Sequence, residues 1–479
     1  MPINTPSIEY QEMAKRWELP LTLLGGTQAM RNAAEKYLPQ EPKESDKAYD
    51  VRKNRTFLFN LYRRTIQSLS GQALIKSVVV NNVPTELENL EWNFDGTGRS
   101  ITDVAHDLFH DELVFGLAHA YMDLPKIQEG QIRNYAEYKD SGIIPYAIVI
   151  SPTSLIGWRI NYDGGVPHIE NIRIYSETVE EDPIDPWVDK IVKRIQVIYP
   201  DRVEHYILTG SEEDEGDETW GLEDVTENPL GYVPIFTAYA AKTGFMTAEP
   251  PLEDMAWLNM RHWQSSSDQN NILHIARVPF IFAKGFQEGE LSNTEIGVNR
   301  MIVASNENAD MKHVEHTGQA IGAGRQDLRD IEQQMAALGA DLVLNKSVAR
   351  QTATAREIDR SESLSVIQIA LRNLETLLEN LYRTAGELIG VDASLVSVTI
   401  GADLNMVQDP NPTDALLKLR ELGLSEEVIL AEAQRRGLLA EYVKISDIDM
   451  SMFDDKLMQK QEPEEYETSE NEMGEDTLN

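Results

Sequence analysis

A long run of regularly spaced apolar residues is the feature that most restricts how this 479-residue chain can fold. Between residues 355 and 389, apolar side chains recur at alternating intervals of four and three. They are Ile367, Leu371, Leu374, Leu378, Leu381, Ala385 and Leu388. Such heptad-like spacing places one apolar line along a helix. We therefore predict a long helix over 355–389 that packs along this line.

Two further helices are predicted in the first quarter of the chain. Residues 46–70 form an amphipathic pattern that ends at Gly71, with an apolar face of Val51, Leu58, Tyr62, Ile66 and Leu69. The second helix is predicted over 100–120, with Ser100 and Asp103 in the positions of a capping box. Its apolar side carries Val104, Leu108 and Phe115.

The middle of the chain has the pattern of strands. Short segments rich in Ile, Val and Tyr are separated by turn residues, at 143–160, 168–175, 189–200 and 202–209. This pattern favours an antiparallel sheet. Two acidic insertions, 177–186 and 211–221, are predicted to be solvated loops. Helices together with an antiparallel sheet indicate an α+β fold class.

A helical part follows residue 250. A helix of about seven turns is predicted over 250–277, although its middle, QSSSDQNN, is unusually polar for a buried helix. Such a polar midsection suits helices that pack side by side around a water-filled channel. An extended stretch comes next, and the glycines at 322 and 324 lead into a helix over 325–343. More helix is predicted within 412–447.

The charge of the chain is strongly negative. There are 80 Asp and Glu against 43 Lys and Arg, a net charge of −37. This balance argues against a protein that coats DNA by neutralising phosphates. It fits a surface that repels DNA and lets it slide, or simply a requirement for solubility. From residue 461 onward there are eight acids and no base, so we predict a disordered tail.

Several classes of protein are not expected from the composition. The chain has no cysteine, which leaves no disulfide framework or thiolate chemistry and fits a reducing compartment or a particle that does not depend on oxidation. The N-terminal residues have no basic start followed by an apolar run, so no signal peptide is expected. No window reaches the ~18–20 apolar residues of a membrane span.

The most enzyme-like string is HDLFHDE at 106–112. His106 and His110 are four residues apart, so one helix face can present both imidazoles to a zinc ion. The hydrolase motif needs Glu after its first His, but Asp107 stands there, and no third ligand is evident. We expect two ordinary surface histidines, and therefore no metal, no cofactor and no catalytic centre.

A basic polar stretch precedes the long helix. Lys346, Arg350 and Arg356 lie in a region of small polar residues without an aromatic. Taken alone, these are exposed side chains of a loop before a helix. The alternative is that they contact a ligand of opposite charge.

The order of these elements resembles the portal proteins of tailed double-stranded DNA bacteriophages. The resemblance extends over nearly the whole chain and is carried by architecture and local texture. It is strongest over 251–285 and 328–365. Portal proteins form a closed ring, usually of twelve subunits, at one capsid vertex, and DNA passes through the ring.

The resemblance implies a portal-like α+β architecture with named parts. These are a wing over 1–250, a first stem helix over 251–276, a clip over 277–322, a second stem helix over 323–340, a tunnel loop and long wing helix over 341–400, a helical crown over 401–452 and an acidic tail over 453–479. The tunnel-loop residues implied to face DNA are Asn345, Lys346, Ser347, Arg350 and Gln351. Repeated around a ring, Lys346 and Arg350 form basic belts that touch phosphates without reading bases.

The resemblance also implies partners and a location. The partners are other copies of the chain, the terminase large subunit, a head–tail adaptor protein, the major capsid and scaffolding proteins, and double-stranded DNA without sequence specificity. The location is the portal vertex of the virion, after synthesis in the host cytoplasm, with no membrane involved. Two alternatives remain from the residues: a metal-dependent hydrolase built on His106 and His110, and a capsid or adaptor protein without DNA contact.

Overall fold

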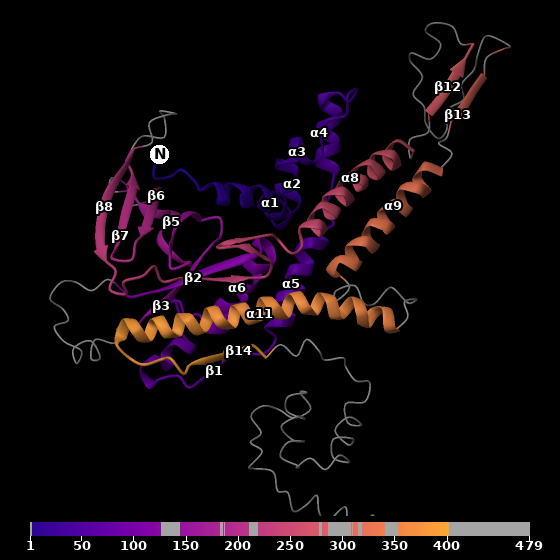
Figure 1. The fold of residues 1–479 in the computed structure, drawn as a ribbon. Helices are drawn as coiled ribbons and strands as arrows, with labels where there is room; N and C mark the ends of the chain where they lie inside the picture. Colours follow the sequence, from indigo (N-terminus) through magenta and orange to yellow (C-terminus); the bar gives the residue numbers. More distant parts are fainter. Residues whose placement is uncertain are drawn as a thin grey trace, which may run out of the picture. The chain divides into compact units, whose positions relative to one another are not determined.

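The computed structural model describes residues 2–125, 144–182, 185, 187–209, 219–276, 280–285, 308, 310–314, 319–340 and 353–401 (Figure 1). The chain divides into two units, Met1–Ala402 and Asp403–Asn479, and all described residues belong to the first. The helices predicted within 412–447 and the acidic tail lie outside the described residues. None of the described helices is long and apolar enough to cross a bilayer.

The N-terminal part is helical. Its helices are α1 (Ile8–Leu24), α2 (Gly26–Asn32), α3 (Ala34–Tyr37), α4 (Asp46–Arg55) and α5 (Leu61–Ala73). The serine before α1 and the serine before α4 accept backbone N–H bonds and so cap these two helices.

The single helix predicted over 46–70 is wrong, because the backbone is extended between α4 and α5. Thr56 has φ −67° and ψ 135°, and its carbonyl accepts two hydrogen bonds from Arg31, at 3.1 and 2.9 Å. Asn60 then caps α5 by accepting from Arg63 N at 2.9 Å. Val51 is exposed rather than part of an apolar face, and Gly71 lies inside α5.

Helix α6 (Ile101–Phe115) has the capping box predicted at Ser100 and Asp103. It ends earlier than predicted, at Gly116, and β2 (Leu117–Asp123) begins at once. Gly116 has φ +87°, and a Cβ there would lie 2.2 Å from the carbonyl oxygen of Glu249. Only glycine permits this turn and this close approach.

Two antiparallel sheets follow. One has the order β3-β2-β9, with β3 at Tyr146–Ile150 and β9 at Ile235–Tyr239. The other has five strands in sequence order: β4 (Leu155–Asp163), β5 (Val166–Glu181), β6 (Asp189–Ile198), β7 (Arg202–Leu208) and β8 (Trp220–Glu227). The predicted antiparallel pairing is confirmed, but the segment predicted over 143–160 holds two strands, β3 and β4, which belong to different sheets. The prediction of a loop over 177–186 is wrong for 177–181, which continue β5. The second predicted loop, 211–221, is wrong for Trp220 and Gly221, which begin β8, and its residues 211–218 lie outside the described part of the chain.

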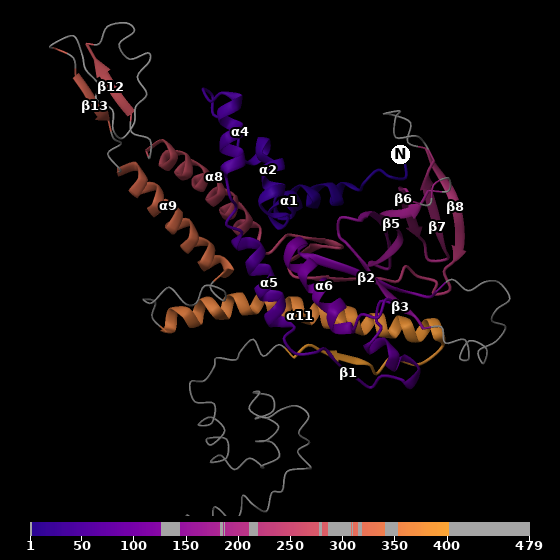
Figure 2. The ribbon, with the colours of Figure 1, turned by 180° about the vertical axis from the view of Figure 1, so that it is seen from behind.

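The long helix α11 (Ala353–Ile389) confirms the apolar line (Figure 2). It packs against β9, β2 and α6. Six of the seven predicted line residues are buried, and Leu388 is half-buried. Smaller elements complete this part: β1 (Val79–Asn81) paired with β14 (Ser397–Thr399), η1 (Thr85–Glu91), and β10 (Lys242–Gly244) paired with β11 (Thr247–Ala248).

The remaining elements are two helices separated by a small sheet. Helix α8 (Glu253–Ala276) confirms the predicted seven-turn helix. It is followed by β12 (Phe280–Lys284), which pairs with β13 (Asp310–Val314), and by α9 (Gln319–Met335), which continues as η2 (Ala336–Ala340). The second helix therefore begins before the glycines at 322 and 324, not after them. The division into wing, stem, clip and crown stays a prediction.

Candidate functional site: the α8–α9 helix pair

Helices α8 and α9 run antiparallel and are joined by polar contacts (Figures 1 and 2). His262 Nε2 lies 3.3 Å from a carboxylate oxygen of Glu332. One turn further along α8, Ser265 donates to Asp327 at 2.7 Å. As residue numbers rise along α8, their partners' numbers fall along α9, which fixes the antiparallel register.

Polar residues in and before the middle of α8 form hydrogen bonds within the chain, and in the middle itself Gln264 donates to the carbonyl of Tyr37 at 2.6 Å. Asn259 is fully buried; its carbonyl accepts from Tyr62 N at 2.9 Å and its amide donates to Phe59 O at 3.0 Å. Two turns later, the Ser267 hydroxyl lies 3.1 Å from that of Thr56. These polar residues therefore tie α8 to the N-terminal segments, and a water-filled channel is not needed to explain them.

A buried ion pair adds to this junction. Arg52 of α4 binds Glu44 through two parallel hydrogen bonds of 2.9 and 2.8 Å and also donates to the carbonyl of Pro39. The hydrogen bonds from Arg52 lower the pKa of the Glu44 carboxyl. Burial raises the pKa of Asp268 on α8, an effect that the charge of Arg52 opposes. The two-pronged geometry fixes α4 in one orientation.

Gly324 lets the two helices approach closely. Gln269 of α8 is buried and donates to the carbonyl of Ile321 at 3.0 Å. A Cβ at Gly324 would lie 2.1 Å from the side-chain oxygen of Gln269. The glycine therefore leaves room for the Gln269 side chain, which a Cβ would displace, and the sequence reasoning missed this role.

The face of α9 turned away from α8 is polar and exposed. Arg325, Gln326, Arg329 and Asp330 are exposed, and Gln326 donates to Asp330 at 2.7 Å. A helix with one covered and one polar exposed side can face water or another macromolecule.

The predicted DNA-facing residues lie outside the described part of the chain. Asn345, Lys346, Ser347, Arg350 and Gln351 belong to 341–352, between the end of η2 and the start of α11. The structure thus places a helix on each side of this stretch, as predicted. The role of the five residues stays a prediction.

The two candidate zinc ligands lie on α6. His106 is exposed and His110 is half-buried, and the nearest carboxylates are those of Asp107 at 4.0 Å and Asp111 at 3.6 Å. Asp107 also pairs with Arg99. Within the described ranges, no group of three or more His, Asp and Glu side chains could hold a metal ion.

Glu112, also on α6, is an unusual buried acid. It is fully buried, and among the described residues neither carboxylate oxygen has a hydrogen-bond partner. Burial raises the pKa of its carboxyl well above the ordinary value, and the neighbouring Asp111 acts in the same direction. The sequence reasoning missed it, although Glu112 lies four residues after Leu108 on the apolar face.

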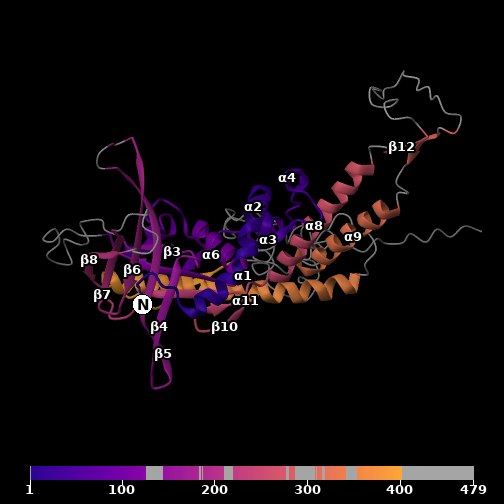
Figure 3. The ribbon, with the colours of Figure 1, turned by 90° about the horizontal axis from the view of Figure 1, so that it is seen from above.

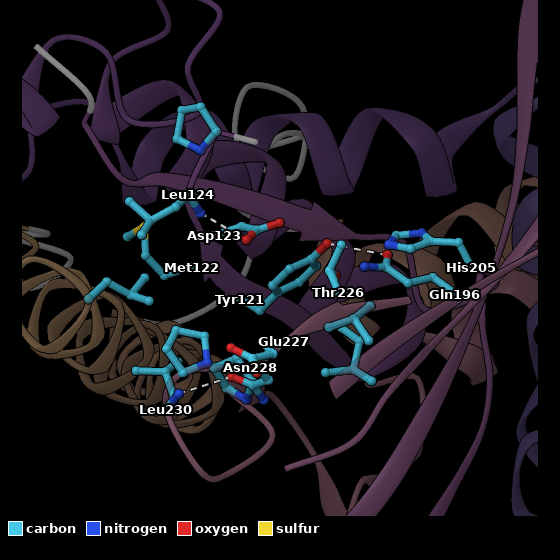
Figure 4. Close-up of a pocket in the computed structure, with 16 residues that line it drawn as sticks. Tyr121, Met122, Asp123, Leu124, Gln196, His205, Thr226, Glu227, Asn228 and Leu230 are labelled. Atoms are coloured by element: carbon cyan, nitrogen blue, oxygen red, sulfur yellow. Dashed lines mark hydrogen bonds between the residues drawn. The ribbon is translucent and has the colours of Figure 1, made fainter. Parts of the chain in front are cut away.

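A pocket of about 390 Å³ lies where the two sheets meet the end of α11 (Figure 4). Tyr121 and Asp123 come from β2, whereas Gln196, His205 and Glu227 come from the five-stranded sheet. Tyr121 donates to Gln196 at 3.4 Å, and burial raises its pKa. The sequence did not indicate this pocket because its walls come from distant segments.

Comparisons with known proteins give limited information. A family model described as a domain of unknown function (DUF4055) matches residues 251–387, which is less than a third of the chain. This match begins just before α8 and extends to the last turn of α11. No curated protein matches the sequence.

Solved structures with similarity to this chain include three gene transfer agent (GTA) particles. "Neck of native GTA particle computed with C12 symmetry" has a TM-score of 0.41 and 12% identity, covering 79% of this chain and 89% of that chain. "Virion of native gene transfer agent (GTA) particle" has 0.39 and 12%, covering 81% and 88%. "Neck of empty GTA particle computed with C6 symmetry" has 0.40 and 12%, covering 84% and 90%. Similarity at these TM-scores supports no conclusion about fold or function.

Proposed function

We propose that this chain is a portal protein of a phage-like particle, a ring-forming conduit for double-stranded DNA at one vertex of the capsid. One observation carries the proposal. The antiparallel helices α8 and α9 leave a mixed α+β part, bracket the small β12–β13 sheet, and are followed within a short stretch by the long helix α11. This is the order that the resemblance to portal proteins implies for stem, clip, tunnel loop and wing helix.

In this proposal each part has a mechanical role. Helices α8 and α9 form the stem, and the exposed polar face of α9 meets either neighbouring subunits or the channel. The stretch 341–352 is the tunnel loop, in which Lys346 and Arg350 touch DNA phosphates in passing. Such contacts are weak and independent of sequence, so they do not stall the DNA. The hydrogen bonds between α8 and the N-terminal segments hold the stem against the wing.

The partners follow from the same proposal. They are other subunits of the ring, the terminase large subunit during packaging, a head–tail adaptor afterwards, and the capsid and scaffolding proteins around the vertex. The chain then needs no cofactor and no catalytic centre. The similar GTA structures are described as neck and virion, and the proposal does not depend on them.

Native mass spectrometry and electron microscopy of the purified full-length chain test the proposal. Closed rings with an axial hole are expected, of about twelve subunits as the resemblance to portal proteins implies. The proposal would be contradicted if the purified chain were a monomer at every concentration and particles contained no ring of it. Shells or flat sheets would instead indicate a capsid protein, and a monomer with stoichiometric zinc, lost in His110→Ala, would indicate the hydrolase.

The DNA contact needs its own experiment. A Lys346→Ala/Arg350→Ala variant is expected to form normal rings but to package or retain DNA abnormally, with the difference depending on salt. Lys15→Ala, which removes an exposed cation of α1, is the control. Packaging equal to that of the unmodified chain at several salt concentrations would show that these two residues do not contact DNA.

A further inference from the structure

One segment of this acidic chain carries only positive charge. Residues 51–85 contain no Asp or Glu, although the chain has 80 of them, and they contain six bases. Three of these, Arg55, Arg63 and Arg64, are exposed and have no carboxylate partner among the described residues. They flank the extended stretch between α4 and α5, and together with Phe57 and Phe59 we call them the basic connector.

The backbone of the basic connector is held firmly. The extended chain alternates, so the side chains of Thr56 and Leu58 are buried while Phe57 and Phe59 are 64% and 41% exposed. Leu58 N donates to Thr27 at 3.3 Å, and the carbonyl of Phe59 accepts from α8 at 3.0 Å. Two aromatic rings are therefore presented beside three arginines on an ordered backbone.

A second surface has the opposite charge. Residues 177–181 of β5 and 189–193 of β6, with Asp182, Trp187 and Val188 next to them, extend beyond the rest of their sheet, because β4 pairs with β5 only up to Ile174 and β7 pairs with β6 only from Arg194 (Figure 3). We call these residues the acidic hairpin. Residues 177–193 hold six acids and two bases, Lys190 and Lys193, which lie opposite Glu180 and Glu177 on the paired strand, so the hairpin is acidic overall.

The acidic hairpin also exposes apolar side chains. Val179 and Ile191 are directly opposite each other and are 68% and 59% exposed, and Trp187 is 94% exposed. An isolated two-stranded hairpin is marginally stable in water, and exposed apolar groups of this size mark interaction surfaces.

The last pair of the β5–β6 ladder, next to the turn, joins two like charges, whereas Glu177 and Glu180 lie opposite lysines. Glu181 and Asp189 are directly paired across the two strands, and like charges in that position are destabilising. A guanidinium from another molecule would remove this repulsion. The hairpin therefore has both an apolar and an electrostatic reason to be covered.

We propose that the acidic hairpin of one subunit docks on the basic connector of the next copy of this chain, an inference that rests on the proposed ring. The two surfaces are complementary. The arginines of the connector would pair with Glu181 and Asp189, and its phenylalanines would pack against the exposed apolar side chains of the hairpin. Two different patches that meet head to tail generate a ring when the rotation closes. In a chain of net charge −37, the acid-free segment offers an acidic hairpin three exposed arginines without a carboxylate partner among the described residues.

A protein partner fits the basic connector better than DNA does. Arginine beside exposed aromatic residues is the composition enriched at protein interfaces and their hot spots. Binding of DNA phosphates would explain the arginines of the connector. It would not explain why the acidic hairpin exposes apolar residues.

Charge exchange in the full-length chain tests the inference. The first variant, Arg63→Glu/Arg64→Glu, makes the connector acidic. The second, Glu181→Lys/Asp189→Lys, makes the hairpin basic. Each variant alone places like charges opposite each other at every contact. We therefore expect the fraction of each variant found in rings by native mass spectrometry to be at least ten-fold lower than that of the unmodified chain. An equal mixture restores opposite charges at both kinds of contact, so it is expected to form rings in which the two variants alternate.

The outcomes separate this inference from the proposed function. If the unmodified chain forms no rings, the proposed function fails and the inference fails with it. If the unmodified chain forms rings and either variant does so equally well, or the mixture does not recover, the inference is wrong and the ring stands. Glu12→Lys changes an exposed residue of α1. It controls for the change in net charge and is expected to leave the rings intact. Circular dichroism checks that each variant is folded.

A DNA-binding measurement completes the test. If the first variant keeps its rings but loses salt-dependent binding of double-stranded DNA, the connector is a DNA surface and the docking proposal is overturned. Phe57→Ser, which removes an exposed ring without changing charge, is expected to weaken rings but not DNA binding.

Discussion

Helices α8 and α11 are both buried along one side, but they are buried by opposite chemistry. On α8 the buried residues include Asn259, His262, Ser267 and Gln269, and each contacts a polar group of another segment. On the described part of α11 the buried residues are apolar apart from Thr384, which donates to a carbonyl of its own helix.

This difference determines how precisely each helix is positioned. An apolar line gains free energy from area removed from water, and several small shifts preserve most of that area. A buried amide must meet its partners at hydrogen-bond distance, or it is left unpaired in an apolar surrounding. Helix α8 therefore fixes the register of α9 and of the connector between α4 and α5, whereas α11 supplies much of the core.

The largest effect is expected from the apolar helix. Leu378 is completely buried, so Leu378→Ala removes apolar contacts and leaves a cavity. We expect a loss of about 3–4 kcal/mol in the free energy of unfolding, measured by urea denaturation at fixed protein concentration. Ile369→Ala on the exposed side of the same helix is the control and should cost less than about 0.5 kcal/mol. Equal losses would show that α11 is not buried along this line.

The next effect is expected from the polar helix. Asn259→Leu keeps the volume but leaves Tyr62 N and Phe59 O without their partner. We expect a loss of roughly 2–3 kcal/mol, because buried unpaired groups cost about 1–3 kcal/mol each. The control is Ser266→Ala, at a half-buried position of the same helix, which should change the free energy of unfolding little. A neutral Asn259→Leu would mean that apolar packing also positions α8.

Glu112 tests a buried polar group without a partner. Because its pKa is raised in the folded protein, the folded state keeps a proton that the unfolded state loses above about pH 4.3. Stability is therefore lost as pH rises from there toward the folded pKa. Glu112→Gln removes this loss, and each unit of raised pKa corresponds to about 1.4 kcal/mol.

The measurement is the free energy of unfolding of the unmodified protein and of Glu112→Gln, from about pH 4, which is close to the ordinary pKa of Glu, to about pH 8. The advantage of Glu112→Gln is expected to be small near the lower limit and to grow with pH. An advantage that is constant over this pH range would mean that the pKa of Glu112 is the same in the folded and unfolded states.

The smallest effect compares two glycines of α9. A Cβ at Gly322 meets no atom within 4 Å, so Gly322→Ala should stabilise the chain by about 0.5–1 kcal/mol through helix propensity. The same change at Gly324 displaces the Gln269 side chain, so it should be neutral or destabilising. Thermal unfolding of the two variants side by side measures the difference, and equal stabilisation would contradict the close approach of α8 and α9.

Much of the fold was predictable because its signals are local. The alternating spacing predicted α11, the Ser100–Asp103 pair predicted the start of α6, and the strand-forming segments predicted the antiparallel sheet. These features depend on residues a few positions apart. The order of the helices also led to the portal proposal, although the residues proposed to face DNA lie outside the described part.

Other features were not predictable because they depend on residues distant in sequence. The helical pattern over 46–70 continues through Thr56. In the structure, Arg31 donates two hydrogen bonds to the carbonyl of Thr56, and the backbone is extended there. The polar middle of α8 suggested a channel, but Gln264 donates to the carbonyl of Tyr37 and Ser267 contacts the hydroxyl of Thr56. For the strand residues 177–181, acidic composition indicated a loop, yet the pairing with β6 decided otherwise.

The sequence alone determined most of the helices and strands, since spacing and capping act within one or two turns of chain, but contacts between distant segments decided the break at Thr56 and the strand residues 177–181. It also determined the charge of the chain, including the acid-free segment 51–85. Only the tertiary structure decided which buried polar groups find partners and which exposed ones do not. Asn259 and Glu112 are both fully buried, but only Asn259 has its side-chain hydrogen bonds satisfied by other described residues. The physical reason is that a hydrogen bond requires a partner within about 3 Å, and folding alone brings residues two hundred positions apart to that distance.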